Sequence, residues 1–246
     1  MASFKDHYSD RAAQYSASRP TYPRELGESI SRMVARRRLA WEAGCGSGQV
    51  TVMLSGFFQR VAATDASALQ LAQAQRHANV RYWCALAESS GLRAGSADLA
   101  ISAQAAHWFD LPAYYAEVRR VTRPGGLICL VTYGIVRAGA EVDPLLEEFE
   151  HQVIQPWWPP ERHHVEEGYA GFPFPFRELE DPGLEMAVEW TFGEFFGYLR
   201  TWSAVRALEM SQGPEEVESF GRRLERAWGA GARSVRWPLT VRAGRI

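Results

Sequence analysis

A glycine-rich turn after an apolar segment is the feature that most constrains the fold of this chain. The segment 39–43 leads into Glu42-Ala-Gly-Cys-Gly-Ser-Gly48, and a second apolar segment ends at Asp65. Glycine tolerates positive φ angles and lets a ligand approach the backbone closely. Asp65 follows the turn by about 20 residues, so a β-α-β unit would place its carboxylate beside the turn, within reach of ribose hydroxyls. The pattern predicts a ligand that contains adenosine.

The spacing of the glycines distinguishes this turn from two phosphate-binding turns. A dinucleotide-binding turn has the pattern Gly-x-Gly-x-x-Gly, and Gln49 occupies the position of its last glycine. No Gly-Lys-Ser/Thr follows, as a P-loop would require. A nicotinamide-dependent oxidoreductase is therefore disfavoured, and the turn fits a ligand with adenosine but no phosphate.

Helix and strand patterns alternate through the first half of the chain, which is typical of a parallel sheet with helices on both faces. Strands are predicted over 39–43, 60–64, 80–84, 97–103 and 127–133, and helices over 24–38, 50–58, 67–78 and 110–123. After residue 137 the pattern changes to a helix over 143–154 and a long aromatic, proline-rich loop. Later come a strand over 184–192, a capping box from Thr191 to Glu194, helices over 194–209 and 214–229, and a strand over 235–241 that contains Pro238.

Composition describes an ordinary globular protein of one domain, 1–246, with 46% hydrophobic and 23% charged residues. A net charge of −2 gives no overall attraction to nucleic acid or to anionic lipid. We expect the three cysteines to be buried free thiols in a reducing cytosol. No signal peptide and no apolar run long enough to span a bilayer is evident, so a cytoplasmic protein without a membrane partner is predicted.

Several segments, in order, resemble the class I S-adenosylmethionine-dependent methyltransferases, specifically the "type 11" small-molecule domain and relatives of trans-aconitate methyltransferase. They are Tyr15-x-x-x-Arg19-Pro-x-Tyr22-Pro, Trp41-Glu-Ala-Gly-Cys-Gly-Ser-Gly48 with Asp65, Ala87-Glu88, Gln104-Ala-Ala-His107-Trp108-Phe109, Arg123-Pro-Gly-Gly126, and Tyr169 with Phe174-Pro-Phe176. The resemblance implies an α/β Rossmann-like, seven-stranded, mostly parallel sheet whose last strand is antiparallel, between strands five and six. It implies a core of 24–137 and 181–246, an N-terminal cofactor-covering segment 1–23, and a small cap of about 138–180 inserted after strand five.

The resemblance also implies the cofactor, S-adenosyl-L-methionine, which leaves as S-adenosyl-L-homocysteine. Asp65 would bind the ribose, and Arg19 the methionine carboxylate in a bidentate pair, with Tyr15 on the same helical face. Glu42 would act beneath the turn, toward the backbone or the methionine amine, and Glu88 or its backbone would mark the adenine end. The expected cofactor-binding residues are Tyr15, Arg19, Glu42, Gly44, Cys45, Gly46, Asp65, Ala66, Ala87, Glu88 and Gln104.

His107 is the candidate catalytic residue. The carboxyl ends of strands in open α/β sheets face the ligand crevice, and imidazole can accept a proton near neutral pH. The alternative is a packed side chain beside Trp108 and Phe109. A carboxylate acceptor needs no base, and His107 would then position an anion. The expected substrate-binding residues are Tyr22, His107, Trp108, Trp158 and Tyr169; no metal site is expected, because His163-His164 has no third ligand at a recognised spacing.

The sequence thus predicts in-line transfer of a methyl group to an oxygen, a carboxylate foremost, of a small molecule. Two alternatives stay open: N-methylation of a small heteroaromatic metabolite, and a non-catalytic S-adenosylmethionine-binding regulatory protein. Nucleic-acid methylation is disfavoured, because Gln104-Ala-Ala-His107 stands where such enzymes have an Asn/Asp-Pro-Pro-aromatic motif. The expected assembly is a monomer or a homodimer.

Overall fold

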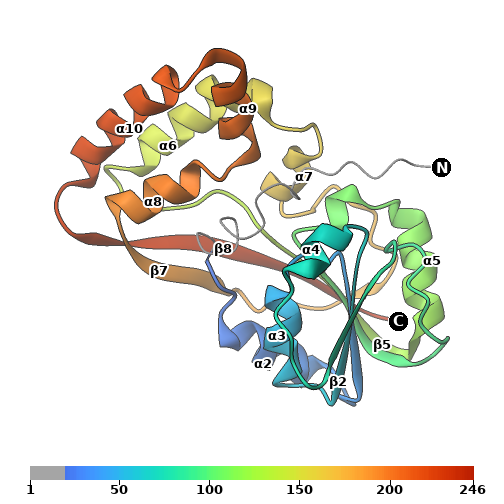
Figure 1. The fold of residues 1–246 in the computed structure, drawn as a ribbon. Coiled ribbons are helices and arrows are strands. Elements are labelled where there is room, and N and C mark those ends of the chain that lie inside the picture. Colours follow the sequence, from blue (N-terminus) through green and yellow to red (C-terminus); the bar gives the residue numbers. More distant parts are fainter. Residues whose placement is uncertain (1–19) are drawn as a thin grey trace.

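A single sheet organises the computed structural model, which describes residues 20–246 (Figure 1). Five parallel strands lie in the order β3-β2-β1-β4-β5, and the antiparallel β8 and the short β6 continue the sheet beyond β5. These strands are β1 (Leu39–Ala43), β2 (Arg60–Asp65), β3 (Val80–Cys84), β4 (Ala97–Ala103), β5 (Thr122–Tyr133), β6 (Arg177–Glu178) and β8 (Ala232–Arg245). The predicted Rossmann-like, mostly parallel sheet is confirmed, with an antiparallel last strand between β5 and β6. The described sheet has eight strands rather than the expected seven, because β7 (Glu185–Thr191) also pairs with β8.

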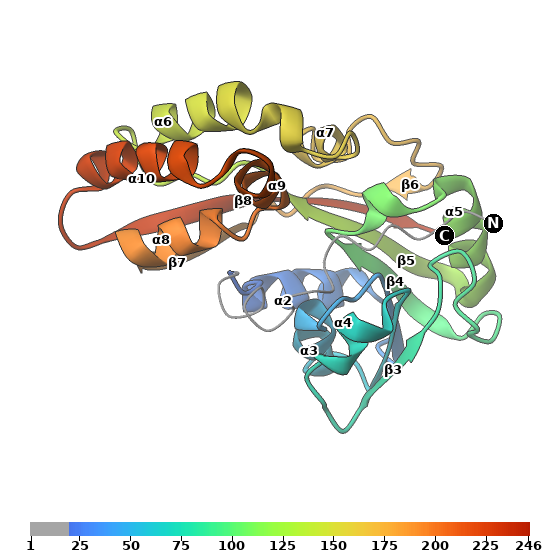
Figure 2. The same cartoon turned by 45° about the horizontal axis from the view of Figure 1, so that its top comes forward.

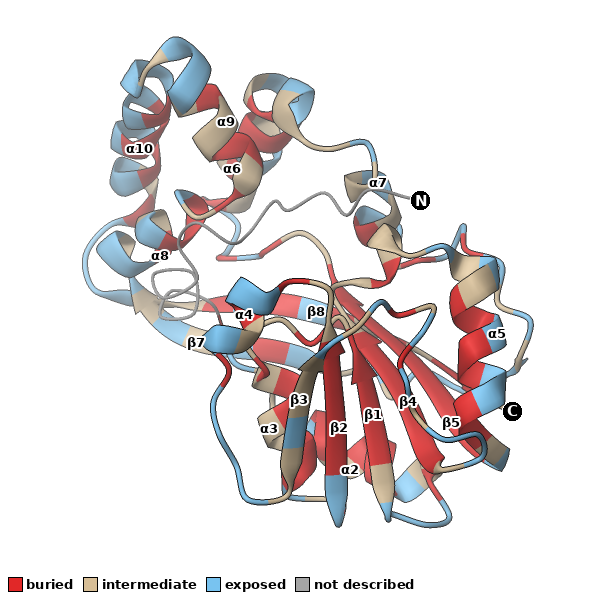
Figure 3. Cartoon of the chain, turned by 45° about the vertical axis from the view of Figure 1, so that its right-hand side comes forward, coloured by how far each residue is buried: buried red, intermediate tan, exposed pale blue. Residues whose placement is uncertain are grey.

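Both faces of β1, β2 and β4 are largely buried, as expected when helices cover both sides, whereas the edge strand β3 is intermediate or exposed along its length (Figure 3). Along β4, Leu99 and Ile101 join one apolar cluster, whereas Ala100 joins the other. The first cluster receives side chains from α2 (Arg24–Met33) and α3 (Gln49–Ser55), and the second from α5 (Leu111–Val121). The helix α4 (Ala68–Ala72) follows β2. Because these strands are parallel, their carboxyl ends lie at the same edge of the sheet, where the glycine turn and the loops of the site follow them.

A helical layer lies at one end of the molecule, apart from α2–α5 (Figures 1 and 2). Its elements are α6 (Asp143–Glu148), the π-helix η3 (Phe149–Val153), the 3-10 turn η4 (Gln155–Trp157), α8 (Phe192–Leu199), α9 (Ser203–Gln212) and α10 (Glu215–Trp228). The short helix α7 (Arg162–Glu166) lies nearer the parallel sheet and contacts β5. Phe149 stacks on Phe220 with ring centroids 3.8 Å apart, and Arg223 donates two hydrogen bonds to Glu148. The helix α10, which the sequence assigned to the core, therefore packs against residues 148–149 of the predicted cap. Helical periodicity shows which face is apolar but not which surface covers it.

The late strands also differ from expectation. Strand β7 (Glu185–Thr191) pairs with the first half of β8, and the two-residue β6 takes the place expected for the sixth strand beside the second half. Pro238 stands opposite Glu185, where the partner of β8 changes from β7 to β5. A proline is tolerated there because the regular ladder is interrupted.

Helix ends were predicted less well than strands. The predicted helix 24–38 ends at Met33, that over 67–78 covers only 68–72, and that over 194–209 is broken into α8 and α9. The capping box is confirmed: Thr191 Oγ1 accepts a hydrogen bond from the Glu194 amide, and a Glu194 carboxylate oxygen accepts from the Thr191 amide at 2.8 Å. Within residues 20–246, no helix has both the length and the apolar character needed to cross a membrane.

Candidate active site

The glycine turn between β1 and α3 is built from three residues with positive φ. Gly44, Gly46 and Gly48 have φ angles of 67°, 54° and 87°, which favour glycine. A Cβ added to Gly44 would lie 2.6 Å from the Ala105 Cβ, and one added to Gly48 would lie 2.5 Å from the Tyr82 hydroxyl. The turn therefore packs directly against the segment after β4. Tyr82, on β3, was missed because nothing in its local pattern shows that it covers the turn.

Asp65 lies beside this turn, as the β-α-β spacing predicts. Its Oδ2 accepts a hydrogen bond from the Gly46 amide at 2.8 Å, and its Oδ1 accepts from the Ser67 amide at 2.8 Å. The Ser67 hydroxyl in turn accepts a hydrogen bond from the Gln70 amide and so caps the start of α4. The two backbone donors fix the orientation of the Asp65 carboxylate, and Ala66 follows it at the end of β2.

Glu42 is buried beneath the turn and accepts a hydrogen bond from the Thr51 hydroxyl. Burial raises the pKa of Glu42 to about 8, and the negative charge of Asp65 adds to the shift. The neighbouring Cys45 is a buried free thiol whose pKa burial also raises well above its usual value. A low-pKa thiolate is the reactive form of cysteine, and the raised pKa keeps the Cys45 thiol protonated. The expectation that all three cysteines are buried is wrong for Cys84, which is exposed.

Two predicted cofactor residues make contacts within the protein. Glu88, next to the buried Ala87, accepts a hydrogen bond from the Asp110 amide at 2.9 Å and so ties the loop after β3 to the start of α5. Gln104 has a positive φ of 53°. Its side-chain amide donates to the Tyr133 carbonyl at 2.9 Å and accepts from the Thr132 hydroxyl at 2.9 Å, so both ends of the amide contact β5.

His107 lies in the 3-10 turn η2 (Ala106–Trp108), directly after β4. Its Nδ1 lies 3.0 Å from the hydroxyl of Tyr169, which belongs to the cap segment, and its ring packs 4.7 Å from the Trp108 ring. The structure thus brings together three of the five predicted substrate residues. Tyr22 lies 6.1 Å from Tyr133 between ring centroids.

Trp158 and its neighbour Arg162 come from the cap. The Arg162 guanidinium lies 4.6 Å from the Trp158 ring and forms an ion pair with the buried Glu150 at 3.2 Å. Trp158 also packs 5.7 Å from Trp202. Arg162 is close enough to affect the charge state of His107, and sequence reasoning missed it because its neighbours in the sequence do not reveal this contact.

The His107 imidazole is uncharged at neutral pH. Burial lowers its pKa to about 3, and the nearby Arg162 and His164 contribute. A neutral imidazole can donate or accept a hydrogen bond, but it provides no positive charge for a carboxylate. The rings of His163 and His164 lie 3.7 Å apart between centroids and are tilted by 42°, and no group of three metal-ligating side chains exists in the part of the chain that the structure describes.

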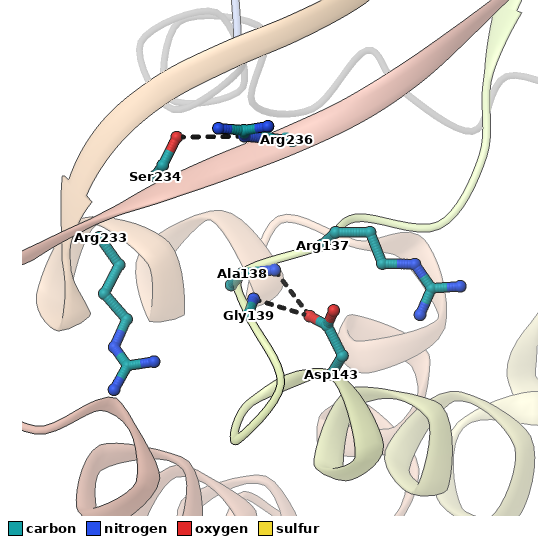
Figure 4. Close-up of a pocket in the computed structure, with 7 residues that line it drawn as sticks. All are labelled: Arg137, Ala138, Gly139, Asp143, Arg233, Ser234 and Arg236. Atoms are coloured by element: carbon teal, nitrogen blue, oxygen red, sulfur yellow. Dashed lines mark hydrogen bonds between the residues drawn. The ribbon is translucent and has the colours of Figure 1, made fainter.

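A groove of about 470 Å³ in the helical end of the molecule contains none of the predicted site residues. Arg137, Arg233 and Arg236 line it, but Figure 4 shows that their guanidinium groups lie apart and point in different directions. Arg137 pairs with Glu147 and Arg233 with Glu141. These arginines do not form a convergent anion site.

The strand order, the glycine turn and the acid at the end of β2 define the class I methyltransferase fold. Residues 41–130 match the methyltransferase domain family. A solved structure from Anaeromyxobacter dehalogenans, named as a type II methyltransferase, is 46% identical, covers 92% of this chain and 97% of its own, and superimposes with a TM-score of 0.88.

Two curated relatives extend the comparison. A Dictyostelium discoideum protein named as a methyltransferase is 32% identical over 83% of this chain and 79% of its own length. A malonyl-[acyl-carrier protein] O-methyltransferase of Pectobacterium atrosepticum is 33% identical over 50% of this chain and 53% of its own length. The chain belongs to the class I methyltransferase family and is an enzyme that uses S-adenosyl-L-methionine. The narrower relation to trans-aconitate methyltransferase stays a prediction.

Proposed function

We propose that this enzyme transfers the methyl group of S-adenosyl-L-methionine to an oxygen, a carboxylate foremost, of a small molecule bound at His107. The observation that carries the proposal is the contact between the two halves of the site. Gly44 of the cofactor turn packs on Ala105, and two residues later His107 contacts Tyr169 of the cap. A ligand in the turn and an acceptor at His107 would be neighbours, as an in-line displacement requires.

The turn fits a cationic ligand without phosphate. The negative charge of Asp65, which contributes to raising the pKa of the buried Glu42 to about 8, disfavours a phosphate beside the turn and suits an ammonium or sulfonium group. Glu42 itself is largely protonated at neutral pH and can hydrogen-bond to the ligand or the backbone. We assign the ribose to Asp65, and the rest of the cofactor to the residues of the turn with Ala66, Ala87 and Glu88. Tyr15 and Arg19 lie outside the described residues and keep their predicted roles in this proposal. The bound cofactor supplies the electrophilic methyl group.

Oxygen is favoured as the acceptor atom because the malonyl-[acyl-carrier protein] relatives are named O-methyltransferases. A carboxylate is already nucleophilic, and the neutral His107 can orient it by one hydrogen bond while alignment supplies much of the rate. Trp108, Tyr169, Tyr22 and Trp158 would complete the acceptor site. The free cysteines fit a reducing compartment, and on that ground we place the enzyme in the cytoplasm.

A panel of small carboxylic acids, phenols and heteroaromatic amines, incubated with deuteromethyl cofactor and read by mass spectrometry, tests the proposal. We expect a one-methyl gain on a carboxylic acid that esterase treatment reverses. A His107→Phe variant should lose turnover while calorimetry shows unchanged cofactor affinity. Methylation only of nitrogen, or cofactor binding with no consumption across the panel, would contradict the proposal and favour one of the two alternatives.

A further inference from the structure

Tyr169, the partner of His107, has an unusual backbone conformation. It is fully buried and has a φ of 61°, a left-handed conformation that costs a non-glycine residue about 1–3 kcal/mol and persists only where surrounding contacts hold it. Gly168 before it has a φ of 59°, and a Cβ added there would lie 2.8 Å from the Thr240 hydroxyl of β8. The backbone of this cap segment therefore lies directly on β8.

Arg242 of β8 donates hydrogen bonds to the backbone of this segment. Its Nη1 donates to the Tyr169 carbonyl at 2.6 Å and to the Phe172 carbonyl at 3.1 Å, and its Nε donates to Glu178 at 2.9 Å. The guanidinium also lies 4.7 Å from the Phe174 ring. A guanidinium presents its donors in a rigid planar fork, so this single side chain fixes the segment at several points.

Arg242 lies on a well-packed part of β8. Arg242 pairs with Leu130 in the ladder between β5 and β8, and Leu130 is fully buried in the sheet. The Tyr169 ring stacks on Phe172 with centroids 4.8 Å apart, so the two residues whose carbonyls Arg242 binds also hold each other. The contacts continue from the sheet through Tyr169 to His107 Nδ1.

We propose that Arg242 is a positioning residue for the acceptor site, which holds Tyr169 so that its hydroxyl fixes the plane and tautomer of the His107 imidazole. The two ring nitrogens of histidine are distinct, and a bond at Nδ1 determines what Nε2 presents to an acceptor. The inference rests on the proposed function only in placing the acceptor at His107. It assigns a role in turnover to a residue of the last strand, far from the cofactor turn in the sequence.

The test begins with nitrogen-15 NMR of the histidine side chains in the enzyme without acceptor. Arg242→Met keeps the stem and removes the donors, and Arg242→Lys keeps the charge but not the fork. Arg236→Met is the matched control, because Arg236 lies on the same strand with an exposed side chain that makes a 3.6 Å ion pair with Glu185 and a 3.4 Å hydrogen bond to Ser234, and contacts neither Tyr169 nor Phe172. We expect the His107 ring signals of Arg242→Met to shift toward a mixture of tautomers, with Arg242→Lys intermediate and the control unchanged.

Kinetic measurements then distinguish a positioning role in turnover from a role in stability alone. Arg242→Met should lower kcat by about 10- to 100-fold, as misplacement of a reacting group does, with cofactor affinity unchanged. In a Tyr169→Phe background the same substitution should cost little more, because the contact with His107 is already lost. A lower melting temperature with native His107 signals and native kcat, or fully additive losses, would overturn the inference. Normal turnover in His107→Phe would instead overturn the proposed function and leave the NMR result standing.

Discussion

The most informative perturbation of the cofactor turn is Gly44→Ala. An L-residue with this positive φ costs about 1–2 kcal/mol, and overpacking a rigid site costs about 1–3 kcal/mol. The added Cβ would lie 2.6 Å from the Ala105 Cβ, which has no rotamer to move away. We therefore expect a loss of about 2–5 kcal/mol in the free energy of unfolding. The same displacement would move the segment that carries His107 and weaken turnover.

A control variant and a rescue variant separate the backbone and packing contributions to this loss of stability. Gly95 also has a positive φ, 61°, but a Cβ there meets nothing within 4 Å, so Gly95→Ala should cost only about 1–2 kcal/mol. Ala105→Gly removes the obstructing methyl group, and the double variant should recover the packing part of the Gly44→Ala loss, a coupling of about 1–3 kcal/mol in a double-mutant cycle. Urea unfolding gives each value. A Gly44→Ala loss equal to that of Gly95→Ala, or no rescue by Ala105→Gly, would refute the reasoning.

Three further predictions concern stability. Because the pKa of His107 is about 3 in the folded protein and near 6.5 when unfolded, the unfolded state binds the extra proton between these values. Stability from this group should fall as pH drops from 6.5 toward 3, and His107→Gln should flatten that part of a pH series of urea midpoints. The pH dependence of stability from Glu42 has the opposite sign. Its pKa of about 8 exceeds the usual 4.5, so its contribution to stability is present below pH 4.5 and lost as pH rises through 8. An unchanged slope of stability against pH in Glu42→Gln would contradict the burial of Glu42 as an uncharged acid. Thr191→Ala removes the capping box and should cost about 1 kcal/mol of unfolding free energy with native methyl transfer, which calorimetry and a turnover assay can check.

The sequence predicted the local geometry of the glycine turn and its neighbouring strands well. The strands 39–43, 80–84 and 97–103 have the predicted bounds, and the glycine turn adopts the positive φ angles that its composition favours. Asp65 lies beside that turn because one helix and one strand separate them. These features depend on backbone preferences and on distances along the chain, which a sequence contains.

The acceptor side could be predicted only in part. The sequence singled out His107 and Tyr169 separately, and their 3.0 Å contact joins residues that are far apart in the chain. The neutral state of the imidazole follows from burial and from Arg162, neither of which a local motif encodes. The same holds for Arg242, whose three hydrogen-bond partners lie in another segment.

By itself, then, the sequence determined the order of strands and helices, the conformation of the cofactor turn and the class of ligand that it suits. Only the tertiary structure decided that α10 packs on Phe149, that β7 pairs with the first half of β8, and that Arg242 of β8 binds the carbonyls of Tyr169 and Phe172. The physical reason is that propensity and spacing act over a few residues, whereas burial, desolvation and pairing between distant segments arise only once the whole chain has packed.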